Sequence, residues 1–386
     1  MSVLLCAIWI DWYAYHVARF RALAEHPSMR GRVSGLELVG GSGVHQRMVF
    51  RSENRGNLPI ETLEPQKGWS DVRQDRLTRL LWRKLDELNP EVVLVPGYYT
   101  APALAAAWWA VRRDRKAILM TETTRADHRR VWWKETAKAR MIRSLFDAAV
   151  TGGKRHVAYL SELEFPSSRI GQFYDVVDNE YYSDGAARLR AERTRKDFQL
   201  PDEYFLYVGR LSAEKNLELL IRSFTKLRDS GMSLLLVGDG PLRTRLEEQA
   251  REARLEGQVR FVGLKSTEEI LPYYAFAHAF VLPSSCEPWG LVVNEAMAAG
   301  LPVIVSNRCG CASDLVQDGV NGFVFDPDHP KELADTLWSA ARLNREVRDS
   351  MGRQSQSLIS RYSPRHWAEE VFRLVCTVSR TRYSAA

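Results

Sequence analysis

The spacing of apolar residues along the chain restricts its fold more than any other feature. Short aliphatic runs, such as Val92–Pro96 and Tyr204–Val208, alternate with amphipathic segments of roughly 12 to 18 residues. In a βαβ unit, a helix of this kind carries the chain back so that the next strand joins the same sheet in parallel. The sequence therefore predicts an α/β protein with parallel sheets.

The alternation runs through the chain twice. In the first series the expected strands are residues 3–9, 33–39, 92–96, 117–121 and 148–151. In the second series they are residues 204–208, 233–237, 259–262, 279–282, 303–306 and 322–325. A chain of 386 residues exceeds the usual size of one domain, so each series is expected to form its own domain.

The expected domain boundaries follow from these two series. We expect residues 1–185 to form an N-terminal Rossmann-like domain and residues 200–362 to form a second one. The charged segment 186–196 between them has the composition of a linker. Residues 363–386 are expected to contain a helix that packs back on the first domain.

The composition indicates the class of protein. Hydrophobic residues make up 45% of the chain and charged residues 26%, which is typical of a soluble globular protein. The five cysteines are odd in number and lack metal-ligand spacing, which favours a reducing compartment over a disulfide framework. Residues 98–111, the longest weakly polar stretch, fall short of the ~20 residues that cross a bilayer. We therefore expect a cytoplasmic protein without a signal peptide or a membrane span.

The net charge of +6 comes from the first half of the chain. Up to Tyr182 this half contains 27 Lys and Arg residues but only 21 Asp and Glu residues. Between Trp108 and Arg143, basic residues alternate with two tryptophan pairs. Such a surface could contact the inner face of an anionic membrane or hold a phosphate-bearing acceptor. Alternatively, it is a solvated helix face whose tryptophans pack inward. The modest charge and the absence of a nucleic-acid-binding motif argue against a nucleic-acid partner.

Two glutamates in the second half occupy unusual positions. Glu287 precedes a Pro-Trp-Gly turn, and Glu295 lies in an apolar helical segment. A buried carboxylate without a partner is costly or shifts its pKa, so Glu295 requires a nearby hydrogen-bond donor. A bound ligand rich in hydroxyls could supply that donor.

Four loops of the second half follow expected strands, and ligands of open parallel sheets bind at this edge. The first loop carries Arg210 and Lys215, which either bind phosphate oxygens or are solvated charges at a helix start. The others begin at Gly238, at Gly263-Leu264 and at Ser284. In the last loop, the amides of Gly290 and Leu291 open a helix and provide an anion site suited to a diphosphate.

Five motifs of the second half resemble those of the retaining glycosyltransferases of family 4. They are Gly-Arg-Leu-Ser-Ala-Glu-Lys-Asn-Leu from Gly209, Val-Gly-Asp-Gly-Pro-Leu from Val237, Val-Arg-Phe-Val-Gly from Val259, the two glutamates with seven residues between them, and Asp-Gly-Val-Asn-Gly-Phe from Asp318. The resemblance covers about residues 204–328. It implies the GT-B fold, with two Rossmann-like domains whose sheets face each other across a deep cleft.

The resemblance also implies an activity, which is transfer of a sugar from a nucleoside-diphosphate sugar to an acceptor hydroxyl with retention of configuration. Arg210 and Lys215 would stabilise the leaving diphosphate, Glu295 would hold the ribose, and Glu287 would face the donor sugar as the third catalytic residue. The implied donor site comprises Gly209, Arg210, Lys215, Gly238, Gly263, Leu264, Glu287, Trp289, Gly290, Leu291 and Glu295. The implied chemistry needs no cofactor and no metal ion.

The first half departs from the family pattern. Many relatives have a glycine-rich loop after the first strand, whereas this chain has Asp-Trp-Tyr-Ala-Tyr-His from Asp11, whose aromatic rings would narrow the acceptor side. The expected acceptor contacts are Asp11, Tyr13, His16, Glu122 and His128, with either histidine as the family's acceptor-side histidine. His16 could instead cap or pack a helix. The acceptor class, whether glycan, glycolipid or small molecule, stays open.

Two other functions fit parts of the pattern. A GT-B sugar-nucleotide epimerase would carry further catalytic carboxylates and histidines, which the sequence does not clearly offer. A non-catalytic subunit that binds a sugar nucleotide would have no need for all four charged residues, Arg210, Lys215, Glu287 and Glu295. The sequence therefore favours an active glycosyltransferase.

Overall fold

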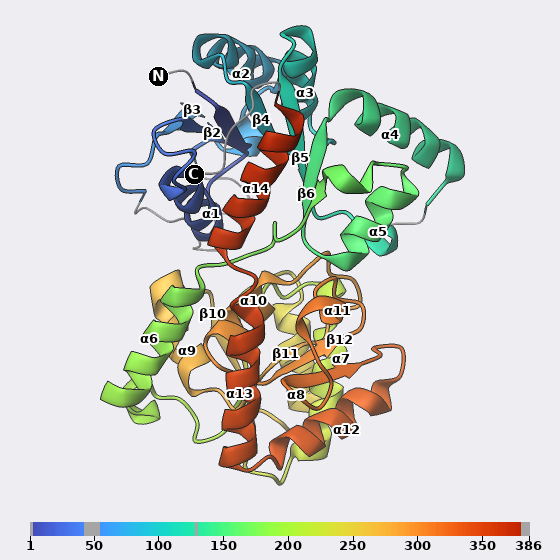
Figure 1. Cartoon of the computed structure of the whole chain (residues 1–386). Coiled ribbons are helices and arrows are strands. Elements are labelled where there is room, and N and C mark those ends of the chain that lie inside the picture. Colours follow the sequence, from blue (N-terminus) through green and yellow to red (C-terminus); the bar gives the residue numbers. More distant parts are fainter. Residues whose placement is uncertain (1–2, 42–54, 128–129, 380–386) are drawn as a thin grey trace. The chain divides into compact units, whose positions relative to one another are not determined.

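The computed structural model describes residues 3–41, 55–127 and 130–379 (Figure 1). The chain forms two compact units. The first unit comprises Met1–Val177 and Ser363–Ala386, and the second comprises Asp178–Tyr362. The C-terminal segment therefore belongs to the first unit, although 185 residues of the second unit precede it in the sequence, counting from 178 to 362.

Within its described residues, the first unit contains a seven-stranded sheet in the order β3-β2-β1-β4-β5-β6-β7. All neighbouring strands run parallel. The strands are β1 (Leu5–Trp9), β2 (Val33–Val39), β3 (Ile60–Glu64), β4 (Val92–Pro96), β5 (Lys116–Thr121), β6 (Ala148–Thr151) and β7 (Ile170–Gly171).

Helices cover both faces of this sheet. The helices are α1 (Ala14–Glu25), α2 (Gln74–Leu88), α3 (Ala101–Arg112), α4 (Trp132–Leu145), α5 (Lys154–Glu162) and α14 (Pro364–Val378). Because side chains of a strand alternate between faces, Cys6 and Ile8 join the core formed with α2 to α5. Trp9 points the other way and lies 6.2 Å from Trp367 of α14, ring centre to ring centre. Helix α14 also contacts α1, as Figure 1 shows.

The second unit contains a six-stranded sheet in the order β10-β9-β8-β11-β12-β13, again counted over described residues. All of its neighbouring strands are parallel as well. The strands are β8 (Tyr204–Val208), β9 (Ser233–Val237), β10 (Val259–Gly263), β11 (Ala279–Leu282), β12 (Val303–Ser306) and β13 (Gly322–Phe325).

The helices of the second unit form two groups. Helices α7 (Leu217–Phe224), α8 (Arg243–Glu252) and α12 (Pro330–Ala341) form one group, in which α7 contacts both others. The second group comprises α6 (Asn179–Glu192), α9 (Thr267–Phe276), α10 (Leu291–Ala298), α11 (Ala312–Leu315) and α13 (Arg345–Ile359). In this group α6 contacts α9 and α10, and α13 contacts α10 and α11.

The predicted fold class of two Rossmann-like parallel sheets is confirmed, and so is the return of the last helix to the first unit. The predicted linker is wrong, because residues 186–192 belong to α6 and α6 belongs to the second unit. Asp178 caps this helix by accepting a hydrogen bond from the Tyr181 amide at 3.1 Å. Three of the charged residues that suggested a linker, Arg188, Arg190 and Glu192, lie in this helix, whose Tyr182 and Ala186 are buried in the core.

None of the described helices combines the length and the apolar character that crossing a membrane requires.

Candidate functional site

The order of strands in the second sheet places a ligand crevice beside β8. From β8 the chain adds β9 and β10 on one side, and it then adds β11, β12 and β13 on the other. Adjacent strands β8 and β11 therefore send their following loops in opposite directions, which opens a crevice at their carboxyl ends. The loop that carries Arg210 and Lys215 follows β8, and the loop that carries Glu287 follows β11.

The structure brings these two loops together. The backbone amide of Ser285 donates to the Glu214 carbonyl at 2.9 Å, and the Ser285 hydroxyl donates to the same oxygen at 3.2 Å. The Lys215 ammonium forms an ion pair with the Glu287 carboxylate, and Ser284 donates to that carboxylate at 3.2 Å. Two of the three predicted catalytic residues thus meet across the switch point of the sheet.

Arg210, the third predicted catalytic residue, pairs within its own loop. Its Nη2 lies 2.7 Å from Glu214 Oε1, and Ser212 donates to the same oxygen at 2.6 Å. Burial opposes ionisation of Glu214, but hydrogen bonds from Ser212, the backbone and Arg210 lower its pKa to about 2. Sequence reasoning missed Glu214 as a site residue, although a glutamate four residues after an arginine is a recognisable pairing signal.

Three glycines allow the backbone segments of this edge to approach closely. Gly209 and Gly238 have φ of 151° and 138°, and a Cβ on Gly238 would lie 1.9 Å from the Gly209 carbonyl oxygen. The Gly238 amide donates to the Gly263 carbonyl at 2.9 Å, and Gly263 has a φ of 83°. Only glycine adopts these conformations without strain at such distances. The predicted Leu264 follows Gly263 in the same loop.

Helix α10 begins at the crevice. Gly290, with a φ of 104°, precedes Leu291, the first residue of the helix, and a Cβ on Gly290 would lie 2.8 Å from Leu282. The amide groups of the first turn carry the partial positive charge that attracts anions. Trp289 has an exposed fraction of only 1%, and its indole donates to Asn294 at 2.9 Å. The structure therefore places the Trp289 side chain in the core.

Glu295 is buried and already has hydrogen-bond donors within the protein. The Tyr274 hydroxyl donates to its Oε2 at 2.7 Å, and Tyr182 also hydrogen bonds to it. Burial raises the pKa of Glu295 to about 7, and the two tyrosines oppose this rise. The expected hydrogen-bond donor is therefore present, and Tyr274 of α9 supplies it from within the protein. The contact of Glu295 with a ribose stays a prediction.

The first sheet has its own switch point, between β1 and β4. The loop after β1 carries Asp11 and Tyr13, and it is fixed by Trp12, whose amide donates to Glu37 at 3.1 Å. Glu37 is buried and accepts two hydrogen bonds of 2.8 Å from Arg55. The predicted narrowing of the acceptor side is wrong for Trp12, because its ring is fully buried in the core.

Of the two histidines predicted at the acceptor side, the structure describes only His16. His16 is buried, stacks on Trp9 at 5.0 Å between ring centres, and has its Nδ1 3.0 Å from the Asp11 carbonyl oxygen. Burial and the nearby charge of Arg19 place the pKa of His16 well below its usual value. His16 therefore caps and packs the start of α1, which is the alternative left open by the sequence. His128 lies outside the described residues.

A buried charged cluster that sequence reasoning missed adjoins Glu122. Arg19 and Asp175 both have an exposed fraction of 0%, with 3.9 Å between Nη2 and Oδ1. The Arg19 guanidinium lies 4.3 Å from the centre of the Tyr174 ring. Burial and the charge of Glu122 raise the pKa of Asp175 well above its usual value. The sequence signal for this cluster was Arg19, which lies on the apolar side of a predicted helix.

Exposed aromatic residues mark the carboxyl edge of the first sheet. Tyr99, in the loop after β4, is 71% exposed, and Trp132 and Trp133 at the start of α4 are 80% and 55% exposed. Trp109 is fully buried, whereas Trp108 is 51% exposed. The prediction of tryptophans packed inward therefore holds for Trp109 and fails for the other three.

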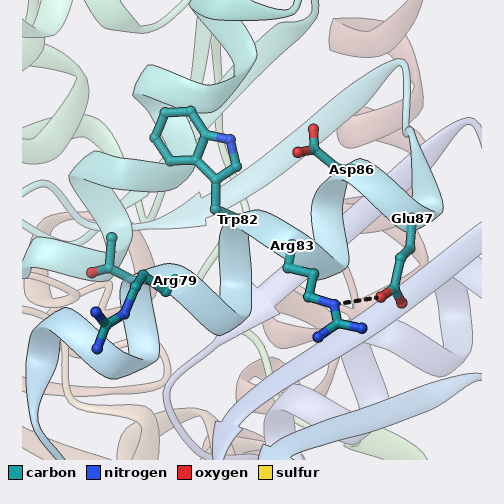
Figure 2. A pocket seen from close by; sticks show the side chains of 6 residues that line it. Arg79, Trp82, Arg83, Asp86 and Glu87 are labelled. Atoms are coloured by element: carbon teal, nitrogen blue, oxygen red, sulfur yellow. Dashed lines mark ion pairs between the residues drawn. The ribbon is translucent and has the colours of Figure 1, made fainter.

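A separate hollow on α2 contains none of the predicted residues. Its walls are Thr78, Arg79, Trp82, Arg83, Asp86 and Glu87, shown in Figure 2. All six belong to one helix, and Arg83 forms an ion pair with Glu87. Across the described part of the chain, no group of three or more His, Cys, Asp or Glu residues is arranged to hold a metal ion.

Residues 190–358 match the family model for Glycosyl transferases group 1. An uncharacterized glycosyltransferase of Methanocaldococcus jannaschii is 34% identical over 37% of this chain and 36% of its own length. The D-inositol 3-phosphate glycosyltransferase of Corynebacterium glutamicum is 27% identical over 71% of this chain and 61% of its own length. The chain thus spans less than two thirds of these curated relatives.

Solved structures resemble the fold of almost the entire chain. HepE from Anabaena in complex with UDP superposes with a TM-score of 0.75 over 98% of this chain and 100% of that one, at 18% identity. Sucrose-phosphate synthase from Thermosynechococcus elongatus gives a TM-score of 0.72 over 98% and 99%, also at 18% identity. Residues 190–358 are therefore similar to the glycosyl transferases group 1 family, and the chain that carries them has the GT-B fold.

Proposed function

We propose that this protein is a retaining glycosyltransferase that moves a sugar from a nucleoside-diphosphate sugar to an acceptor hydroxyl. The observation that carries the proposal is the pairing of Lys215 with Glu287 across the switch point of the second sheet. These residues lie within the segment that matches the group 1 family. HepE has been crystallised with UDP and with UDP-glucose, which supports a nucleotide sugar as the donor here.

The diphosphate would bind where the cations and the start of α10 converge. In the structure, Arg210 pairs with Glu214 and Lys215 pairs with Glu287. A diphosphate carries more charge than either carboxylate and would replace them as the partner of both cations. The amides that begin α10 would add a further anion contact. Glu287 would then be released from Lys215 and face the donor sugar.

The reaction follows from the placement of these charges. The bond between the anomeric carbon and the phosphate oxygen breaks, and negative charge grows on the diphosphate while Arg210 and Lys215 stabilise it. Glu287 stabilises the positive charge that develops at the anomeric carbon. The acceptor oxygen bonds to the same face of that carbon, and its proton passes to the departing phosphate oxygen. The cations supply the stabilisation that a metal ion gives in other transferases, so we propose a metal-independent enzyme without a cofactor.

We propose that the first unit binds the acceptor. Asp11, Tyr13 and Glu122 lie on loops at the carboxyl edge of its sheet, and the loop after β4 at the same edge carries the exposed Tyr99. His16 would act by holding the loop of Asp11 rather than by touching the acceptor. Glycans, glycolipids and small molecules all offer the hydroxyl that this reaction needs.

We also propose that the exposed tryptophans of α4 contact an anionic membrane from the cytoplasmic side. Trp132 and Trp133 are followed by the exposed cations Lys134 and Arg140 on the same helix. Aromatic and basic side chains together favour the interface of anionic lipids. Co-sedimentation with phosphatidylserine vesicles tests this, with Trp108→Ala on α3 as the control for the Trp132→Ala/Trp133→Ala variant. Equal sedimentation of both variants would contradict the proposal.

The function is tested first by donor binding. We expect one nucleotide class among UDP-, GDP-, ADP- and TDP-sugars to raise the melting temperature, because a ligand of the native state stabilises it. The anomeric configuration of the product, read by NMR, then tests retention. Binding without transfer to any acceptor would favour a non-catalytic subunit, and interconversion of the donor sugar would favour an epimerase.

A further inference from the structure

Three helices of the second unit meet at the Glu295 side chain. Tyr182 comes from α6, Tyr274 from α9 and Glu295 from α10. Tyr274 donates to the carboxylate at 2.7 Å, and its ring lies edge to face with the ring of Tyr182 at 5.8 Å. Glu295 keeps an exposed fraction of 7%.

Helix α6 fixes this arrangement at two points. In the middle of the helix, a Cβ on Gly185 would lie 2.4 Å from Leu271, so α6 and α9 touch at a distance that only glycine allows. Farther along, Arg190 donates to the Ala275 carbonyl at 2.6 Å and to the Ala299 carbonyl at 2.7 Å. These carbonyls lie at the C-terminal ends of α9 and α10, where unpaired acceptors favour a cation.

The groups around Glu295 are mainly neutral donors. Tyr182 faces it from α6 and Tyr274 faces it from α9, whereas the Tyr181 hydroxyl donates to the Thr267 carbonyl and Arg190 donates to the carbonyl at the end of α10. From α13, the uncharged Gln356 donates to the Ala298 carbonyl at 3.1 Å. Burial raises the pKa of Glu295 to about 7, and the hydrogen bonds of Tyr274 and Tyr182 hold it from rising further. Its charge near neutral pH therefore depends on two hydroxyl groups.

We propose that Tyr182 and Tyr274 are positioning residues of the nucleotide-sugar site, which keep the Glu295 carboxylate ionised and oriented for a ribose diol. This inference rests on the proposed function, because that function gives Glu295 its ribose contact. An ionised carboxylate accepts several hydrogen bonds at once, whereas a protonated one must donate at one oxygen. Nucleotide affinity should accordingly increase as the pH rises through the pKa of Glu295.

The test compares Tyr274→Phe and Tyr182→Phe with Tyr204→Phe. Tyr204 is an equally buried tyrosine whose hydroxyl donates to the Tyr273 carbonyl at 2.8 Å, so its variant controls for the loss of a buried hydroxyl. Calorimetry measures the affinity for UDP, GDP, ADP and TDP from pH 6 to pH 9. Loss of one hydrogen bond to the Glu295 carboxylate should raise its pKa, so the pH at which nucleotide affinity rises should shift upward by about one unit. Affinity at pH 7 should fall roughly five- to tenfold and recover at pH 9.

A second readout needs no ligand. The pKa of Glu295 is about 7 in the folded protein, whereas the ordinary pKa of a glutamate is 4.5, so between these two pH values the folded state binds one more proton than the unfolded state. The free energy of unfolding should therefore fall as the pH rises from 4.5 through 7. In Tyr274→Phe this fall should extend to higher pH, and in Glu295→Gln it should be absent.

The outcomes separate the two proposals. Tyrosine variants whose affinity profile matches that of Tyr204→Phe, or falls equally at every pH, would overturn the positioning role. If Glu295→Gln binds nucleotide as tightly as the unchanged protein at every pH, the ribose contact in the proposed function fails. If Glu295→Gln weakens binding while both tyrosine variants behave normally, the ribose contact stands and only the positioning role fails.

Discussion

The two units differ in the exposure of the charged side chains that pair with one another. In the second unit, Arg210 and Lys215 pair with glutamates on loops, and the Arg210 side chain is 46% exposed. In the first unit, the ion pairs of Arg19 with Asp175 and Arg55 with Glu37 are largely or fully buried and hold structural elements in place. Charges that a ligand can reach therefore characterise the second unit, while the first presents exposed aromatic side chains such as Tyr99.

If the buried ion pairs of the first unit are structural, the largest loss of stability should come from substituting Arg55. Arg55→Met leaves Glu37 buried without its bidentate partner, which should lower the free energy of unfolding of the first unit by about 3 to 5 kcal/mol. Chemical denaturation measures the loss. Arg79→Met is the control, because the pair of Arg79 with Asp75 is exposed and should contribute less than about 1 kcal/mol. Equal effects of the two substitutions would show that Arg55 is not structural.

The next largest effect is expected from Gly238→Ala. The new methyl group meets the Gly209 carbonyl oxygen and the backbone keeps a φ of 138°, so the second unit should lose roughly 2 to 4 kcal/mol. Gly257→Ala is the matched control, since a Cβ there has nothing within 4 Å. Thermal unfolding should separate the two variants by several degrees. Similar melting temperatures would mean that the backbone segments can move apart.

Lys215→Ala should affect the ligand rather than the fold. Loss of a charge-assisted contact of roughly 1.5 to 3 kcal/mol should lower donor affinity or turnover at least tenfold. The control is Lys226→Ala, which removes an exposed ion pair with Asp335 and should leave donor binding unchanged. Calorimetry with the donor found in the thermal-shift panel measures both. Unaltered donor binding in Lys215→Ala would remove the reason for assigning the second unit to the donor.

The smallest effect is expected from removing metal ions. Because the proposed site stabilises the diphosphate with Arg210, Lys215 and backbone amides, transfer activity should persist in excess EDTA. Activity is compared before and after chelation and again after adding Mg²⁺. A complete loss that Mg²⁺ restores would contradict the metal-independent mechanism.

The sequence predicted correctly those elements whose structure depends on residues close together in the chain. A βαβ series is recognisable from periodicity, and the strands 33–39, 92–96, 204–208 and 233–237 have the predicted bounds. It failed for α6, because a helix with charges on one side and a buried opposite side resembles a linker when its neighbours are unknown. It also failed for β3, because Ile60–Glu64 lies at the edge of the sheet and contains three polar residues, Glu61, Thr62 and Glu64, which interrupt the apolar pattern of a buried strand.

By itself, the sequence determined the class of fold and the order of the donor motifs, because both depend on residues close together in the chain. Only the tertiary structure decided which groups face each other. It paired Lys215 with Glu287, 72 residues apart, and it gave Glu295 two tyrosine partners from other helices. It also buried His16 and Trp12 behind the first strand. Such contacts depend on strand order and helix packing, which local patterns do not encode.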